Sequence, residues 1–310
     1  MRKYLLFVLL ILPLVLTGCF SETETTKRIS SREVRRHVKG TKSDEEKFME
    51  LYELKDFSKW EIGRLFYVTD NKLKSILTPY DGIDTLNLAD KVVKYQGYSE
   101  YISIDGEKDI ALYFLVDDSI YIEYQTNRTM EQITEMERVF KVPFMVDMEL
   151  IVSVNNLLKG RELYIKTPLW YDENNNLIKG ERFIPVVITE ILPGDATLPL
   201  KLKFQSVESG VTAYLFISSN DDSIINRSFE SIFSFDNPKN EYPNISDENW
   251  KLIIKGRVAV GMTKDECRLS LGSPNSISSR PNYSTLVEIW YYNNGAYLIF
   301  EDGLLTKFRR

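Results

Sequence analysis

Three short motifs occur twice in the central part of the chain, in the same order and at similar spacings. The paired stretches are residues 63–68 with 160–165, residues 117–120 with 221–224, and residues 127–131 with 226–230. A repeat constrains the fold more than any single motif does, because both copies must reach the same structure with their own residues. We therefore predict two tandem modules near residues 56–145 and 150–240. As full domains, they would span residues 44–145 and 146–240.

Both modules are predicted to be mainly β, because β-branched and aromatic residues gather in short runs between turn-forming residues. The first module has the runs RLFYVT, DIALYFLV and SIYIEYQ, and the second has RELYIKT, LPLKLKFQ and VTAYLFIS. Short strands at this spacing favour small barrels or sandwiches, and we expect an SH3-like barrel in each module. Asp117 and Asp118 fit a polar hairpin turn better than a calcium site, because no loop supplies the other oxygen ligands at a recognisable spacing.

Two short helices are predicted near the C-terminus from the signals at their ends. Ser246 can cap the first helix, and Thr263 with Glu266 forms a capping box at the start of the second. Gly272 is placed where a left-handed C-cap is expected, and Pro274 prevents the second helix from continuing.

Three strands are expected after these helices, in the stretch STLVEIWYYNNGAYLIFEDGLLTKFR. Asn294 with Gly295, and Asp302 with Gly303, are hairpin signals that divide it. The order helix, helix, strand, strand, strand makes a two-layer α+β domain at residues 245–310. The predicted fold class of the chain is therefore mainly β with α+β: two small barrel-like modules followed by this domain.

This last domain resembles a known family. The matching features are Gly261-Met262-Thr263, Leu271-Gly272 with Pro274, Trp290 with Tyr292, and the stretch YLIFEDGLL from Tyr297. In this order they resemble the SmpA/OmlA domain, the family that includes the outer-membrane assembly lipoprotein BamE. The same layout resembles the repeated units of the β-lactamase inhibitory protein. The core residues that the resemblance implies are Met262, Leu271, Trp290 and Phe300.

The N-terminus resembles the signal of bacterial lipoproteins. Arg2 and Lys3 precede an apolar run over residues 4–16, which is too short to span a bilayer as a helix. The run ends in Leu-Thr-Gly-Cys, which resembles a lipobox, so residues 1–18 are interpreted as a signal peptide and Cys19 as the site of lipid attachment. Several acyl chains would then anchor the protein stably to the cell envelope. Phe20 favours the outer membrane if the organism is Gram-negative.

Composition restricts the chemistry that the mature chain can perform. Residues 19–43 form a polar tether whose basic residues suit either a solvated linker or contact with anionic lipid head groups. The net charge of −6 argues against nucleic-acid binding. His37 is the only histidine, and Cys267 is the only cysteine after Cys19, so we expect no catalytic site, metal site or cofactor.

Two functions remain as expectations, neither of them enzymatic. The first is a lipid-anchored scaffold or adaptor of the cell envelope, with the membrane and other envelope proteins as partners. The second is an inhibitor, or a ligand- or cell-wall-binding lipoprotein, that uses the aromatic sheet face of the last domain. The candidate interaction residues on that face are Tyr291, Tyr292 and Tyr297, since aromatic side chains anchor interfaces. The oligomeric state stays open.

Overall fold

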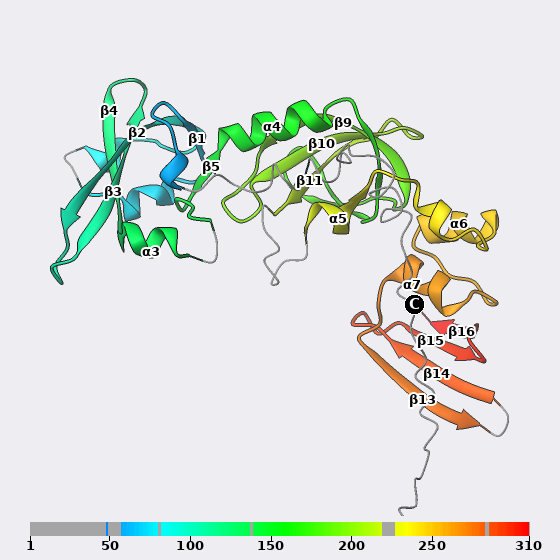
Figure 1. Ribbon diagram of the computed structural model, residues 1–310. Coiled ribbons are helices and arrows are strands. Elements are labelled where there is room, and N and C mark those ends of the chain that lie inside the picture. Colours follow the sequence, from blue (N-terminus) through cyan, green and yellow to red (C-terminus); the bar gives the residue numbers. More distant parts are fainter. Residues whose placement is uncertain are drawn as a thin grey trace, which may run out of the picture. The chain divides into compact units, whose positions relative to one another are not determined.

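The computed structural model divides the chain into two units, residues 1–43 and residues 44–310. The described residues all lie in the second unit: Phe48 and residues 57–79, 82–136, 139–218, 227–282 and 285–309 (Figure 1). The predicted signal peptide, Cys19, the tether and the repeat motif at residues 221–224 lie outside them. The described part is mainly β, with three sheets.

The first sheet has five antiparallel strands in the order β4-β3-β2-β1-β5. Its strands are β1 (Leu65–Val68), β2 (Val92–Ile102), β3 (Lys108–Val116), β4 (Ile120–Thr129) and β5 (Met145–Asp147). The helical elements of this module are η1 (Phe57–Lys59), η2 (Asn71–Ile76), η3 (Ile83–Thr85) and α3 (Met130–Thr134). Apolar side chains of all five strands form one core, which includes Phe66, Tyr95 and Phe114.

The second sheet has seven strands in the order β12-β6-β9-β10-β11-β7-β8. Its strands are β6 (Glu162–Ile165), β7 (Leu169–Tyr171), β8 (Leu177–Lys179), β9 (Ile184–Pro193), β10 (Leu200–Ser206), β11 (Thr212–Ile217) and β12 (Phe233–Ser234). Its helices are α4 (Met148–Leu158) and α5 (Phe229–Ile232). The apolar side of α4 packs on β9 and buries Leu150, Val154 and Leu158 in a second core.

Both sheets contain the same pairing pattern. A strand of four residues lies between a long strand and a short edge strand, as β1 lies between β2 and β5 and β6 lies between β9 and β12. The register is also shared at the first motif of the repeat: Tyr67 pairs with Val92 and Val146, and Tyr164 pairs with Pro185 and Ser234. The strands β7 and β8 have no counterpart in the first sheet.

A β-bulge falls at the same place in the long strand of each sheet. In β2 the register shifts between Tyr95 and Gly97, opposite Phe114, and in β9 it shifts beside Ile188, opposite Phe204. The glycine before each short strand also repeats its hydrogen bond. Gly63 N–H donates to the Tyr95 carbonyl at 2.7 Å, and Gly160 N–H donates to the Ile188 carbonyl at 2.8 Å. Bulges bend and twist a strand, so the two sheets curve at equivalent points.

The third motif of the repeat also has one structural role in both copies, as a helix cap. Thr129 caps α3 by accepting from Gln132 N–H, and Ser228 caps α5 by accepting from Ser231 N–H. The second motif differs. Asp117 lies in the turn between β3 and β4, whereas Asp221 follows β11 in the chain and lies outside the described residues. The expected equivalence of Asp117 and Asp221 therefore does not fit the order of the strands.

The two modules meet at Asp147 without a linker. Asp147 is the last residue of β5, and its side chain also caps α4 by accepting from Glu149 N–H at 3.0 Å. Asp147 is bound in turn by Arg64, which precedes β1: the guanidinium Nε donates to its carboxylate at 3.2 Å, and Nη2 forms an ion pair with it. Arg64 Nη1 also binds Glu149 at 2.6 Å. Residues of both modules thus share one ion cluster.

The C-terminal domain has four strands, where the sequence predicted three. Its elements are η4 (Pro238–Glu241), α6 (Asp247–Ile254), α7 (Lys264–Leu271), β13 (Ser276–Asn282), β14 (Thr285–Tyr291), β15 (Tyr297–Glu301) and β16 (Leu304–Arg309), with the sheet in the order β13-β14-β15-β16. The missed strand is β13, whose sequence SISSRPN lacks alternating apolar residues and contains a proline. Such a sequence is tolerated at the edge of a sheet, where β13 lies.

The helix starts predicted near the C-terminus are confirmed, and one helix end differs from the prediction. Thr263 and Glu266 form the reciprocal capping box of α7. Gly272 ends that helix at a positive φ of 86°, but its ψ of −176° lies outside the left-handed helical conformation that was expected. Met262, Trp290 and Phe300 are buried in the domain core, as expected. Leu271, the last residue of α7, is only partly buried and packs against this core, so the expectation that it is a core residue is confirmed only in part.

Candidate interaction surface

Tyr291 and Tyr297 lie side by side on one face of the C-terminal sheet. They are direct partners in the β14–β15 register, and Tyr291 is 43% exposed. Residues next to each other in a strand point to opposite faces. Trp290 accordingly lies on the other face, where it is buried and its ring centroid is 4.7 Å from that of Phe300. The helices α6 and α7 pack on that other side through Trp250, Ile253 and Cys267.

Tyr292 does not belong to this surface, which corrects the expectation from the sequence. Its side chain packs against the domain core, and its hydroxyl donates to the Gly272 carbonyl at 3.2 Å. Burial raises the pKa of Tyr292 to about 12. Tyr292 therefore holds the end of α7 against the sheet.

The exposed sheet face, as we name it, extends beyond the two tyrosines. The register pairs Ile289 with Ile299, two residues along the strands from the tyrosine pair, and Val287 follows two residues further on the same face. The apolar residues of the exposed sheet face are therefore Val287, Ile289, Tyr291, Tyr297 and Ile299. All of them are exposed or only partly buried. The sequence contains a signal for this face, because successive residues of β14 and β15 point to alternate faces of the sheet. The expectation grouped Tyr291 with Tyr292, which are neighbours in sequence and therefore lie on opposite faces.

Cationic residues border the exposed sheet face on both edge strands. Arg280 is paired with Val287, Lys307 with Ile299, and Arg309 with Tyr297, so their side chains lie on the same face. Glu301, which is paired with Val287, is the carboxylate that the register places on this face among the described strand residues. The face thus has an apolar centre and a mainly basic border.

The opposite face of the sheet is covered by α6 and α7, and its charged residue is paired. Lys264 at the start of α7 forms an ion pair with Glu288 at 2.6 Å, and the hydrogen bond from Lys264 lowers the pKa of Glu288. Cys267 is fully buried, and burial raises the pKa of its thiol to about 12. A thiol that stays protonated is not a nucleophile, so this cysteine acts as a core residue.

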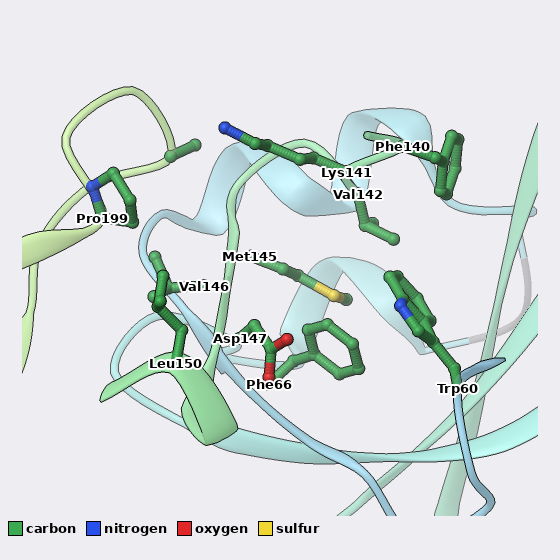
Figure 2. Close-up of a pocket in the computed structure, with 11 residues that line it drawn as sticks. Trp60, Phe66, Phe140, Lys141, Val142, Met145, Val146, Asp147, Leu150 and Pro199 are labelled. Atoms are coloured by element: carbon green, nitrogen blue, oxygen red, sulfur yellow. The ribbon is translucent and has the colours of Figure 1, made fainter. Parts of the chain in front are cut away.

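A pocket lies where the first two modules meet, lined by residues of the first core together with Leu150, Ala196 and Pro199 of the second module. Figure 2 shows a pocket in which Trp60, Phe66 and Met145 point toward one another, with Asp147 among the residues that line it. Phe66, Phe140, Val142 and Met145 are core residues, and Trp60 packs against them. Burial raises the pKa of Asp147, although the hydrogen bonds from Arg64 oppose that rise. The carboxylate of Asp147 is committed to Arg64 and to the cap of α4, so it is not available as a reactive group in this pocket.

Other kinds of functional site were sought among the described residues. Within the described ranges, no three His, Cys, Asp or Glu residues are grouped to hold a metal ion. No helix in the described part of the chain has the length and apolar content needed to cross a membrane. Cys19 lies outside the described residues. No family model, curated protein or solved structure matches this chain.

Proposed function

We propose that the protein is a lipid-anchored adaptor of the cell envelope, which holds a partner protein on the exposed sheet face of its C-terminal domain. The observation that carries this proposal is the cross-strand pair of Tyr291 and Tyr297 on a sheet face that no helix of the domain covers. Tyrosine gives a rigid side chain that is both apolar and hydrogen-bonding, which suits a protein interface. The lipobox-like sequence before Cys19 supplies the anchor.

The partner that fits this face has an apolar patch bordered by carboxylates. Arg280, Lys307 and Arg309 surround the apolar centre, with Glu301 as the opposing charge. Charge complementarity of this kind speeds encounter and sets orientation more than it adds affinity. A broad, open face also suits a protein better than a small ligand, which needs a concave site.

The architecture of the rest of the chain supports an assembly of interaction modules. The shared register and shared bulge of the first two sheets support a duplication, and we propose that each copy is an SH3-like barrel. The capped α7 and the antiparallel sheet support the proposed kinship of the last domain with the SmpA/OmlA family. Outer-membrane assembly or integrity is the process in which such an adaptor would act.

The lipid anchor is tested by Cys19→Ala. This change removes the thiol to which the lipid would be attached, so the protein is expected to leave the membrane fraction and appear in the soluble fraction. Labelling with a radioactive fatty acid in growing cells is expected to mark the wild-type chain and not the variant. A variant that is labelled fully, or that stays in membranes after a high-salt wash, would contradict the proposed anchor.

The exposed sheet face is tested by photo-crosslinking in intact cells with the full lipidated chain. A photo-reactive phenylalanine analogue in place of Tyr291 is expected to form an adduct with one envelope protein. The matched control is the same analogue at Ile277, which is 51% exposed on the same sheet but is paired with Trp290 and so lies on the opposite face.

Charge reversal then checks the border of that face. Lys307→Glu with Arg309→Glu is expected to weaken the adduct formed from position 291 severalfold, because a carboxylate border on the partner would now be repelled. Equal adducts from positions 291 and 277, or an adduct that ignores the reversal, would exclude the exposed sheet face as the binding surface. An adduct with a secreted hydrolase would instead identify the protein as an inhibitor.

A further inference from the structure

A cavity of about 190 Å³ lies where the segment between β8 and β9 meets the ends of α6 and α7. Three cationic residues line it: Lys179, Arg182 and Lys255. All of its lining residues belong to the described part of the chain, and no aspartate or glutamate is among them. The cavity is therefore a site of concentrated positive charge in a chain whose net charge is −6.

Arg182 is fixed at the base of this site by two helix ends. Its backbone N–H donates to the Ile254 carbonyl at 3.3 Å, and its Nη1 donates to the Leu269 carbonyl at 2.9 Å. Ile254 is the last residue of α6, and Leu269 lies in the last turn of α7. The C-terminal end of a helix carries about half a negative elementary charge, so the end of α7, which the guanidinium contacts, offsets about half of the positive charge of Arg182.

Lys179 has no such offset within the described residues, whereas Lys255 is the C-cap residue of α6, at the negative end of that helix. Both side chains are exposed at the mouth of the cavity, and neither forms an ion pair with any described residue. Arg182 also keeps an unused donor, because its buried Nε makes no hydrogen bond within the described residues. Burial lowers the pKa of Arg182, since desolvation disfavours the cation. An anion in the cavity would relieve this imbalance.

We propose that this cavity binds a phosphate group. A dianionic phosphate balances two lysine charges, whereas a carboxylate balances one. Guanidinium and ammonium groups are the side chains that bind phosphate oxygens by charge-assisted hydrogen bonds. The site is distinct from the exposed sheet face, because its lining residues come from the β8–β9 segment, from the ends of α6 and α7, and from the turn between β14 and β15.

The test is calorimetric titration of inorganic phosphate into the full-length lipidated protein in an uncharged detergent at low ionic strength. Saturable binding is expected. The variant Lys179→Gln with Lys255→Gln is expected to bind about 30-fold more weakly, since each of the two lost charges contributes about 1 kcal/mol at contact in water. Both lysines are exposed, so the fold should be kept, and circular dichroism checks this. The matched control is Lys159→Gln, an exposed lysine after α4 that does not line the cavity.

The ligand's chemistry is separated by two further probes. Acetate is expected to bind more weakly than inorganic phosphate. Dimethyl phosphate carries one negative charge, so it is expected to bind much more weakly than inorganic phosphate, which would assign the site to a free phosphate or a monoester; equal affinity would contradict the argument from a dianion. The proposal is overturned if phosphate shows no saturable binding, if the double lysine variant binds as well as the wild type, or if acetate binds as tightly as phosphate.

Discussion

Arg64→Ala is expected to lower the free energy of unfolding by about 3 to 5 kcal/mol, because it removes one partner of a buried ion cluster. The Arg64 side chain is 3% exposed, and the carboxylate of Asp147 is 10% exposed. Without the guanidinium, Asp147 remains buried with only the Glu149 N–H to stabilise its charge. Urea denaturation of the wild-type and variant proteins measures the difference.

The pH dependence of this loss has a definite sign. Burial already raises the pKa of Asp147, and removal of Arg64 raises it further, since the opposing hydrogen bonds are gone. A carboxyl group with a raised folded-state pKa favours folding when it is protonated, and that contribution is lost as pH rises through the folded-state pKa. The deficit of the variant is therefore expected to be larger at neutral pH than in mild acid.

Two further variants make the Arg64 prediction specific. Arg64→Ala combined with Asp147→Asn is expected to recover part of the lost stability, because asparagine is neutral and still caps a helix. Lys94→Ala removes an exposed ion pair, in which Lys94 and Asp118 are 3.1 Å apart, and is expected to cost less than about 1 kcal/mol. If Arg64→Ala lowers the free energy of unfolding no more than Lys94→Ala does, the ion cluster at Asp147 contributes no more than an exposed ion pair and the prediction is wrong.

Gly180→Ala is the second change with a large expected effect, about 3 kcal/mol of lost stability. A Cβ atom at Gly180 would overlap the indole ring of Trp170, although the backbone there lies outside the positive-φ region. Trp170 cannot move aside easily, because it is 4% exposed, its Nε1 donates to the Thr167 carbonyl at 2.9 Å, and its ring packs edge-on against Phe204. Overpacking of a fixed core costs about 1–3 kcal/mol and occasionally more.

A matched glycine separates this steric effect from backbone strain. Gly210 has φ 69°, and a Cβ there would meet no atom within 4 Å. Gly210→Ala is therefore expected to cost only the strain of the left-handed conformation, about 1 kcal/mol. Gly180→Ala with Trp170→Phe should recover part of the stability, because the smaller ring leaves room. If urea denaturation shows equal losses of unfolding free energy for Gly180→Ala and Gly210→Ala, Trp170 moves aside at little cost and the predicted steric effect is wrong.

The local signals in the sequence were the most informative about the fold. Thr263 and Glu266 specify a cap through contacts only three residues apart, so the start of α7 could be predicted without knowledge of the rest of the chain. The motif at Gly63 and Gly160 was equally informative, because a glycine at positive φ repeats one backbone hydrogen bond in both sheets. The match between Asp117 and Asp221 gave a wrong expectation about the repeat, since Asp117 lies between β3 and β4 whereas Asp221 follows β11 in the chain.

Features that depend on distant contacts could not be predicted in this way. The strand β13 is held by pairing with β14 rather than by its own apolar pattern. Tyr292 was grouped with Tyr291 because they are neighbours in sequence, whereas the Gly272 carbonyl determines where its hydroxyl lies. The cavity at Arg182 required a contact with Leu269, which no local motif encodes.

The joint at Asp147 has a mechanical consequence for an anchored protein. If the chain is anchored at Cys19 and bound by a partner at its C-terminal sheet, as proposed, tension between these two points must pass through Asp147. Because β5 ends at Asp147 and α4 begins at the next residue, no linker between them can extend under a small force. Extension at the joint can begin only when the pairing of β5 with β1 parts or α4 unwinds. The joint at Asp147 is therefore built to transmit load from one module to the next rather than to absorb it.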